Sequence, residues 1–79
     1  MRRATRNLLE ELLWGCGEVY RKPKPEVEAD LASLGVRLQH ERPLHEVGRW
    51  YLLDAASLSR AAEAVGAVWH DETQRWVRS

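Results

Sequence analysis

Apolar residues over the first twenty positions recur at intervals of three and four, which is the pattern of an amphipathic helix. The pattern predicts a helix over about 4–20, within which Gly15 and Gly17 each cost about 1 kcal/mol relative to alanine. A linker follows at 21–24, because proline biases the residue before it away from helical dihedral angles. The apolar face of this predicted helix consists of Leu8, Leu9, Leu12, Leu13, Cys16, Val19 and Tyr20.

The next segment predicts a second helix followed by a β-hairpin. Pro25 suits the first turn of a helix over 25–34, and Gly35 stands where a left-handed residue commonly ends a helix. After Gly35 apolar and polar positions alternate, which indicates a strand that begins at Val36, and a second β-rich run covers 49–53. The connection between these runs is longer than a tight turn, so we expect it to project from the body.

The last third of the chain repeats this order of elements. Asp54 or Ser57 can cap a third helix, which Gly66 ends. Two short β-rich runs follow at 67–70 and 75–78, and a four-residue turn joins them. The segment therefore predicts a helix and a second hairpin.

Together these elements predict an α+β fold, in which an N-terminal helix precedes two helix–hairpin units that form one four-stranded antiparallel sheet (αα-ββ-α-ββ). Residues 1–79 form a single domain in this prediction, with the N-terminal helix and linker at 1–24 and the helix–hairpin units at 25–53 and 54–79. Trp69 and Trp76 occupy facing positions of the last hairpin, which predicts a partly buried cross-strand pair.

Size and charge exclude several classes of protein. With 79 residues the chain has room for one small core, which excludes a large enzyme with an enclosed substrate cavity. Twelve Lys plus Arg balance twelve Asp plus Glu, so no long-range field draws the chain to nucleic acid or anionic lipid. The uncharged runs of the chain, such as Leu12–Gly17, are too short to span a bilayer, and the single Cys16 can form no internal disulfide. We therefore expect a cytoplasmic protein that does not bind membranes.

The candidate catalytic and metal-binding residues form no recognisable site in the sequence. His40 and His45, each followed by a glutamate, lie five positions apart around a proline, whereas the zinc-protease pattern places two histidines four positions apart on one helix. Cys16 falls on the apolar face of the first predicted helix, where a free cysteine acts as a small hydrophobic residue rather than a nucleophile. We expect no enzyme activity and no bound metal or cofactor.

Residues 50–77 resemble a small family of unknown function. The resemblance is carried by Trp50-Tyr51-Leu52, by a helix that ends in Val65-Gly66-Ala67, and by Trp69 and Trp76 on either side of an acidic turn. This arrangement is similar to modules that are appended to conjugative-plasmid primases and to other DNA-processing proteins of mobile elements. The resemblance implies a strand, a short helix and a terminal hairpin, and it implies a role near nucleic acid.

The surplus of tryptophan and arginine favours a protein-binding role, because these residue types dominate the hot spots of protein–protein interfaces. Together with the resemblance described above, this surplus makes the chain similar to inhibitors that phages and plasmids encode, such as anti-CRISPR proteins. The predicted function is a non-enzymatic module that binds a host protein or protein–nucleic-acid complex, such as a CRISPR effector, and masks its nucleic-acid-binding surface. The candidate phosphate mimics are Glu26, Glu28, Asp30, Glu41, Glu46, Asp71 and Glu72.

Two other functions stay open on the sequence. Arg37, Arg49 and Arg75 lie on predicted strands among aromatic residues, as in proteins that hold single-stranded nucleic acid. A nucleic-acid-binding accessory protein is therefore the main alternative. The role of a cofactor subunit of a hydrolase is a weaker one.

The first predicted helix also raises the question of self-association. Its apolar face is wide for a helix that covers only part of a sheet, and an exposed apolar patch usually marks an interface. Twofold homodimers are the commonest soluble oligomers, which predicts a dimer through Leu9, Leu12 and Cys16. The alternative is that this face is buried within the chain.

Overall fold

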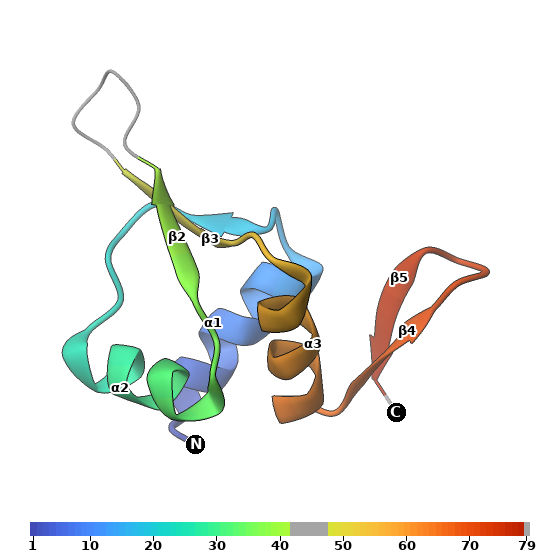
Figure 1. Cartoon of the computed structure of the whole chain (residues 1–79), viewed down its shortest axis with the longest axis horizontal. Helices are drawn as coiled ribbons and strands as arrows, with labels where there is room; N and C mark the ends of the chain where they lie inside the picture. Colours follow the sequence, from blue (N-terminus) through green and yellow to red (C-terminus); the bar gives the residue numbers. More distant parts are fainter. Residues whose placement is uncertain (42–47, 79) are drawn as a thin grey trace.

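The structure, a computed structural model, describes residues 1–41 and 48–78. These residues contain three helices and two antiparallel sheets (Figure 1). The predicted α+β class is confirmed, and so are the bounds predicted for the second helix and for both strands of the last hairpin. The predicted connection around His45 and Glu46 lies outside the described residues. The elements in chain order are α1 (Arg3–Trp14), β1 (Glu18–Val19), α2 (Pro25–Leu34), β2 (Leu38–Glu41), β3 (Arg49–Leu52), α3 (Ala55–Ala64), β4 (Ala67–His70) and β5 (Arg75–Arg78).

The strands form two separate sheets, which corrects the predicted single sheet of four strands. One sheet has the order β1-β3-β2, and the other consists of β4 and β5. β1 pairs with β3 through Glu18–Tyr51 and Val19–Trp50, while β2 pairs with the other side of β3. β4 and β5 pair only with each other, and this hairpin stands at one end of the molecule, beyond α3 (Figure 1).

The apolar pattern of the first twenty residues covers a helix and a strand rather than one helix. α1 ends at Trp14, after which Gly15 leaves the helical region (φ −97°, ψ −139°) and Gly17 takes a positive φ of 80°, which favours glycine. The chain then turns into β1. Cys16, predicted to lie on an apolar helical face, is exposed in the bend between α1 and β1.

The residues that begin and end α2 and α3 stand where the sequence predicts them. Gly35 ends α2 in the left-handed region (φ 73°, ψ 24°), and Gly66 after α3 also has a positive φ, of 72°. At the start of α3 the Asp54 carboxylate accepts a hydrogen bond from the Ser57 N–H at 2.7 Å. Arg60 of α3 donates to the carbonyl oxygen of Gly35 at 3.0 Å, which ties the end of α2 to α3.

The hydrophobic core draws on all three helices and on the three-stranded sheet. Leu9 of α1 is fully buried, and Leu12 keeps only 5% of its surface exposed. These two residues, predicted to form a dimer interface, are packed inside the chain's own core, so the interpretation of their helix face as an exposed surface is wrong. The other core residues are Val19, Val27, Leu31, Val36, Leu52, Ala61 and Val65.

Candidate functional site

Three of the four tryptophans meet where the C-terminal hairpin lies against the end of α1. Trp14, Trp69 and Trp76 line an open cleft of about 1030 Å³ together with Arg75 and Arg78. We call it the tryptophan–arginine cleft and define it by these five residues. Two of its tryptophans keep much of their surface in solvent, 37% for Trp14 and 41% for Trp69.

The hairpin holds Trp69 and Trp76 side by side. The two residues are cross-strand partners, and their rings meet edge to face with centroids 5.2 Å apart and an interplanar angle of 65°. The indole N–H of Trp69 donates to Asp71 Oδ1 at 2.7 Å, and the Gln74 side-chain amide donates to the Asp71 carbonyl oxygen at 2.7 Å, which closes the turn. The predicted cross-strand pair is thus confirmed, with Trp76 half-buried and Trp69 more exposed than predicted.

α1 contributes the third tryptophan, from a position 62 residues before Trp76 in the chain. The indole N–H of Trp14 donates to the backbone carbonyl oxygen of Trp76 at 2.7 Å. The Arg78 guanidinium lies over the Trp14 ring, 4.9 Å from its centroid, and forms an ion pair with Glu10. Contacts from two residues of β5 therefore hold the hairpin against α1.

The lining of the cleft is balanced in charge, with two acids and two arginines, and the hairpin turn beside it adds two more acids. Arg78 is paired with an acid of α1, whereas Arg75 forms no ion pair with another described residue. An exposed cation without an ion-pair partner in the described part of the chain therefore lies beside the tryptophans, next to the acids of the hairpin turn. The four acids are Glu10, Glu11, Asp71 and Glu72.

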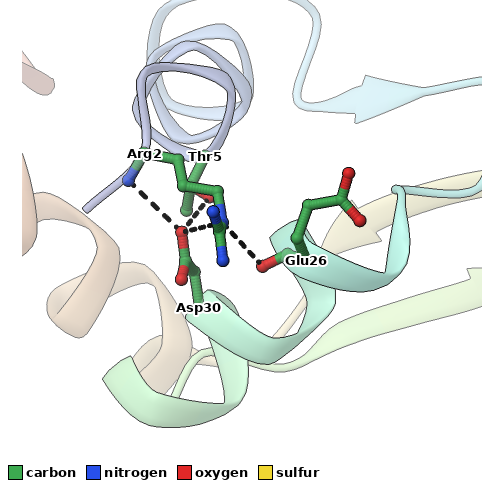
Figure 2. Close-up of polar contacts among 4 residues, drawn as sticks. All are labelled: Arg2, Thr5, Glu26 and Asp30. Atoms are coloured by element: carbon green, nitrogen blue, oxygen red, sulfur yellow. Dashed lines mark hydrogen bonds and ion pairs between the residues drawn. The ribbon is translucent and has the colours of Figure 1, made fainter.

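Three of the predicted phosphate mimics, Glu26, Glu28 and Asp30, lie on α2 and not in this cleft. Figure 2 shows that Asp30 has a structural role, since its Oδ2 accepts from the Thr5 hydroxyl at 2.6 Å and from the Arg2 backbone N–H at 3.3 Å. The Thr5 hydrogen bond is the main cause that lowers the pKa of Asp30 below its ordinary value, and Arg2 lowers it further. Asp30 thus ties α2 to the start of α1.

The other predicted phosphate mimics are divided between two places. Asp71 and Glu72 are exposed in the hairpin turn beside the cleft. Glu41 ends β2, and its side chain lies outside the described part of the structure, as does Glu46. The described acids of the predicted set are therefore not brought together, and only the pair in the hairpin turn borders the cleft.

The arginines predicted to contact nucleic acid are also far apart. The pairing of Leu38 with Leu52 and of Glu41 with Arg49 places Arg37 and Arg49 at opposite ends of the β2–β3 hairpin. Arg49 is further paired with a glutamate of β1 at 3.4 Å. Arg75 lies on the other sheet, in the cleft. These three arginines therefore form no continuous basic surface.

A second open groove, of about 760 Å³, lies between α2, α3 and the β2–β3 hairpin. Two of its polar side chains, Asp54 and Arg60, are occupied by the helix-end contacts described above. Its tryptophan, Trp50, is stacked on His40 with ring centroids 4.1 Å apart. This groove holds one tryptophan, which is already stacked, whereas the tryptophan–arginine cleft holds three, two of which keep much of their surface exposed. We therefore place the candidate site in the cleft.

Metal clusters and membrane-spanning helices are absent from residues 1–41 and 48–78. No group of three His, Cys, Asp or Glu side chains in these residues is placed to hold a metal ion. No helix among them is long and apolar enough to cross a membrane. His45, which the sequence analysis compares together with His40 to the zinc-protease pattern, lies outside the described residues.

Of the five cleft residues, the sequence assigned only Arg75 to a candidate site, predicted Trp69 and Trp76 as a structural pair, and gave Trp14 and Arg78 no place in a site. The only local signal for Trp14 was an aromatic residue beside, rather than within, the apolar face of an amphipathic helix. Its hydrogen-bond acceptor lies on the last strand, so its place in the cleft depends on tertiary structure. The same holds for Arg78, whose partners Trp14 and Glu10 are both on α1.

Comparisons of the chain with protein-family models, with curated proteins and with solved structures found no significant match in any of the three. The resemblance of residues 50–77 to modules of mobile elements therefore stays a prediction. Inference about function rests on the cleft itself.

Proposed function

We propose that the chain is a small non-enzymatic module that binds another protein through the tryptophan–arginine cleft. The observation that carries this proposal is the exposure of Trp14 and Trp69 in one cleft with Arg75. Contiguous exposed apolar surface usually marks an interaction site, and tryptophan and arginine supply much of the energy at the centres of interfaces. The contacts that hold the hairpin against α1 pre-organise these groups, which lowers the entropy lost on binding.

The two acids that the hairpin turn adds beside the balanced lining of the cleft favour a partner with a basic surface. Glu10 is already paired with Arg78, which leaves Glu11, Asp71 and Glu72 against Arg75. Complementary charge steers association and fixes orientation. A nucleic-acid-binding surface of a host protein has the required basic chemistry, and the carboxylates of the hairpin turn would take the place of phosphates on it.

We extend this proposal to the inhibitors that phages and other mobile elements encode. The mechanism would be the masking of a nucleic-acid-binding surface on a host complex, such as a CRISPR effector. This extension is supported by the resemblance of residues 50–77 and by the two acids of the hairpin turn beside the cleft. It implies that the chain acts in the cytoplasm, together with such a complex.

Direct binding of single-stranded nucleic acid is the competing function. Arg75 beside exposed tryptophans would suit a platform on which bases stack. However, affinity for nucleic acid comes largely from cations that neutralise phosphates. Because the two arginines of the cleft are balanced by two acids of its lining and the adjacent turn adds two more acids, the cleft has no net positive charge for phosphates, which favours a protein partner over a nucleic acid.

A photo-cross-linking residue in place of Arg75 tests this proposal. The matched control carries the same residue in place of Arg21, which is exposed in the segment between β1 and α2, at the other end of the molecule from the hairpin (Figure 1). Irradiation in a lysate of the host cell should give a discrete adduct from position 75 and none from position 21. The adduct should resist nuclease and disappear after protease treatment.

Two results would contradict the proposal. An adduct at position 75 that nuclease removes would support direct nucleic-acid binding instead. No adduct at position 75, or the same adducts at positions 75 and 21, would show that the cleft is not the binding site.

A further inference from the structure

β4 has one edge that pairs with no other strand in the described part of the chain. Val68 and Trp69 of this strand keep 49% and 41% of their surface exposed, and because neighbouring side chains of a strand point to opposite faces, both faces of β4 expose an apolar group. Edge strands of monomers are normally protected by charged residues, prolines or bulges. β4, with the sequence Ala-Val-Trp-His and a regular register, has none of these protections.

The backbone of β4 is oriented for pairing at that edge. The carbonyl oxygen of Trp76 accepts a hydrogen bond from Trp14 and so points away from β4. In an antiparallel ladder the N–H and C=O groups of two paired residues either all point toward the partner strand or all point away from it. The two arrangements alternate along each strand. Trp69, the partner of Trp76, therefore turns its N–H and C=O to the free edge of β4, and so does Ala67 two residues earlier.

We propose that this edge binds the same edge of a second copy of the chain, so that the two hairpins form one four-stranded antiparallel sheet. Ala67 and Trp69 both direct their backbone N–H and C=O groups to the free edge and are separated by one residue. Such an edge can pair with a second copy of itself. Under a twofold axis Ala67 of each copy pairs with Trp69 of the other, and Val68 lies opposite Val68.

The side chains in this register favour a second copy as the occupant. Each large Trp69 ring lies beside a small Ala67, so the two indoles do not compete for one space. On the opposite face Val68 and its cross-strand partner Val77 form a row of four valines across the two hairpins. Pairs of β-branched side chains stabilise neighbouring strands, and no two like charges lie opposite each other along β4.

The other edge of the hairpin limits this assembly to two copies. Trp14 lies at the outer edge of β5, where it binds the Trp76 carbonyl, so the joined sheet does not expose a second edge of the same kind. An edge of four residues gives an interface smaller than those of stable dimers. We therefore expect a weak and reversible dimer that forms at high protein concentration, and this inference does not rest on the proposed function.

Disulfide trapping tests the register directly. In a Cys16→Ser background, which removes the exposed native thiol, Val68→Cys puts two thiols on the twofold axis. His70→Cys is the matched control, because it lies on the same strand and face but its two copies would be about 13 Å apart along the strands. In a glutathione redox buffer the Val68→Cys chain should form a disulfide dimer at least about tenfold faster than the His70→Cys chain, whose thiols are out of reach.

Sedimentation equilibrium adds a measurement that needs no trapped bond. For the Cys16→Ser chain, the mass should rise with concentration from 9.1 kDa toward twice that value. Val68→Lys, which would place two like charges opposite each other, should abolish the rise. Equal trapping rates at positions 68 and 70, a mass that stays at 9.1 kDa, or a rise that Val68→Lys leaves unchanged would each overturn the proposal.

Discussion

Truncation of Trp76 to alanine should cost the protein a large part of its stability. The indole of Trp76 is half-buried and meets the Trp69 ring edge to face at a centroid distance of 5.2 Å. Trp76→Ala removes this buried apolar surface and the aromatic contact, while it keeps the backbone carbonyl to which Trp14 donates. The loss therefore measures what the side chain itself contributes.

The size of the loss follows from these two contributions. Removal of a well-buried tryptophan costs about 3–5 kcal/mol, and half of that, about 2 kcal/mol, suits a half-buried side chain. The edge-to-face pair adds about 0.5–1.5 kcal/mol, so we expect about 3 kcal/mol in total. In a domain of roughly 60–100 residues each kcal/mol lowers the melting temperature by about 4–8 °C, which gives a fall of about 12–24 °C.

Thermal unfolding followed by far-ultraviolet circular dichroism measures this fall. Tyr20→Ala is the matched control, because Tyr20 is 60% exposed and its hydroxyl donates only to the nearby Glu18 at 2.8 Å. This exposed truncation should change the free energy of unfolding by about 0.5 kcal/mol or less. A melting temperature of Trp76→Ala within a few degrees of the wild type, or equal losses in the two variants, would refute the reasoning.

Three further substitutions test other parts of the structure. Leu9→Ala empties a fully buried position and should lower the free energy of unfolding in urea by about 2–5 kcal/mol, whereas a loss near zero would contradict the burial of this residue. Gly35→Ala places a side chain at a φ of 73°, at a cost of about 1–2 kcal/mol. Its Cβ would also lie 2.8 Å from Arg60 Nη1, so the loss should be smaller in an Arg60→Ala background, and equal losses in both backgrounds would exclude this contact. The Ser57 N–H, as the main cause, lowers the pKa of Asp54, so the stability that this carboxylate adds is complete above its ordinary pKa and is lost as the pH falls through its lower pKa in the folded protein. Urea unfolding of Asp54→Asn should therefore depend less on pH in the acid range than that of the wild type, and parallel pH profiles would contradict the assignment.

Features that depend on neighbours in the sequence could be predicted without the structure. Pro25 and Gly35 mark the bounds of α2, and Asp54 marks the start of α3, because a helix end needs a particular backbone conformation or capping group at one residue. The pairing of Trp69 with Trp76 also follows from local sequence, since a four-residue turn places them opposite each other.

Features that depend on distant residues could not be predicted in this way. Val19 continues the apolar spacing of α1, and only the pairing of Glu18 and Val19 with Tyr51 and Trp50 makes this segment a strand. The last hairpin likewise joins neither outer strand of the three-stranded sheet. The cleft has the same origin, because the hairpin sequence does not reveal that Trp14 lies against it.

Two charge reversals test most directly whether the tryptophan–arginine cleft binds its partner. Glu72→Lys changes the hairpin turn beside the cleft, and Glu26→Lys makes the same change of charge on α2, at the other end of the molecule (Figure 1). The partner that photo-cross-linking identifies is purified and titrated in isothermal titration calorimetry. Glu72→Lys should weaken its binding at least about tenfold, which is about 1.4 kcal/mol. Glu26→Lys should leave the dissociation constant within about twofold of the wild type, because its charge lies outside the contact. Equal losses in the two variants, or a larger loss in Glu26→Lys, would contradict binding through the cleft.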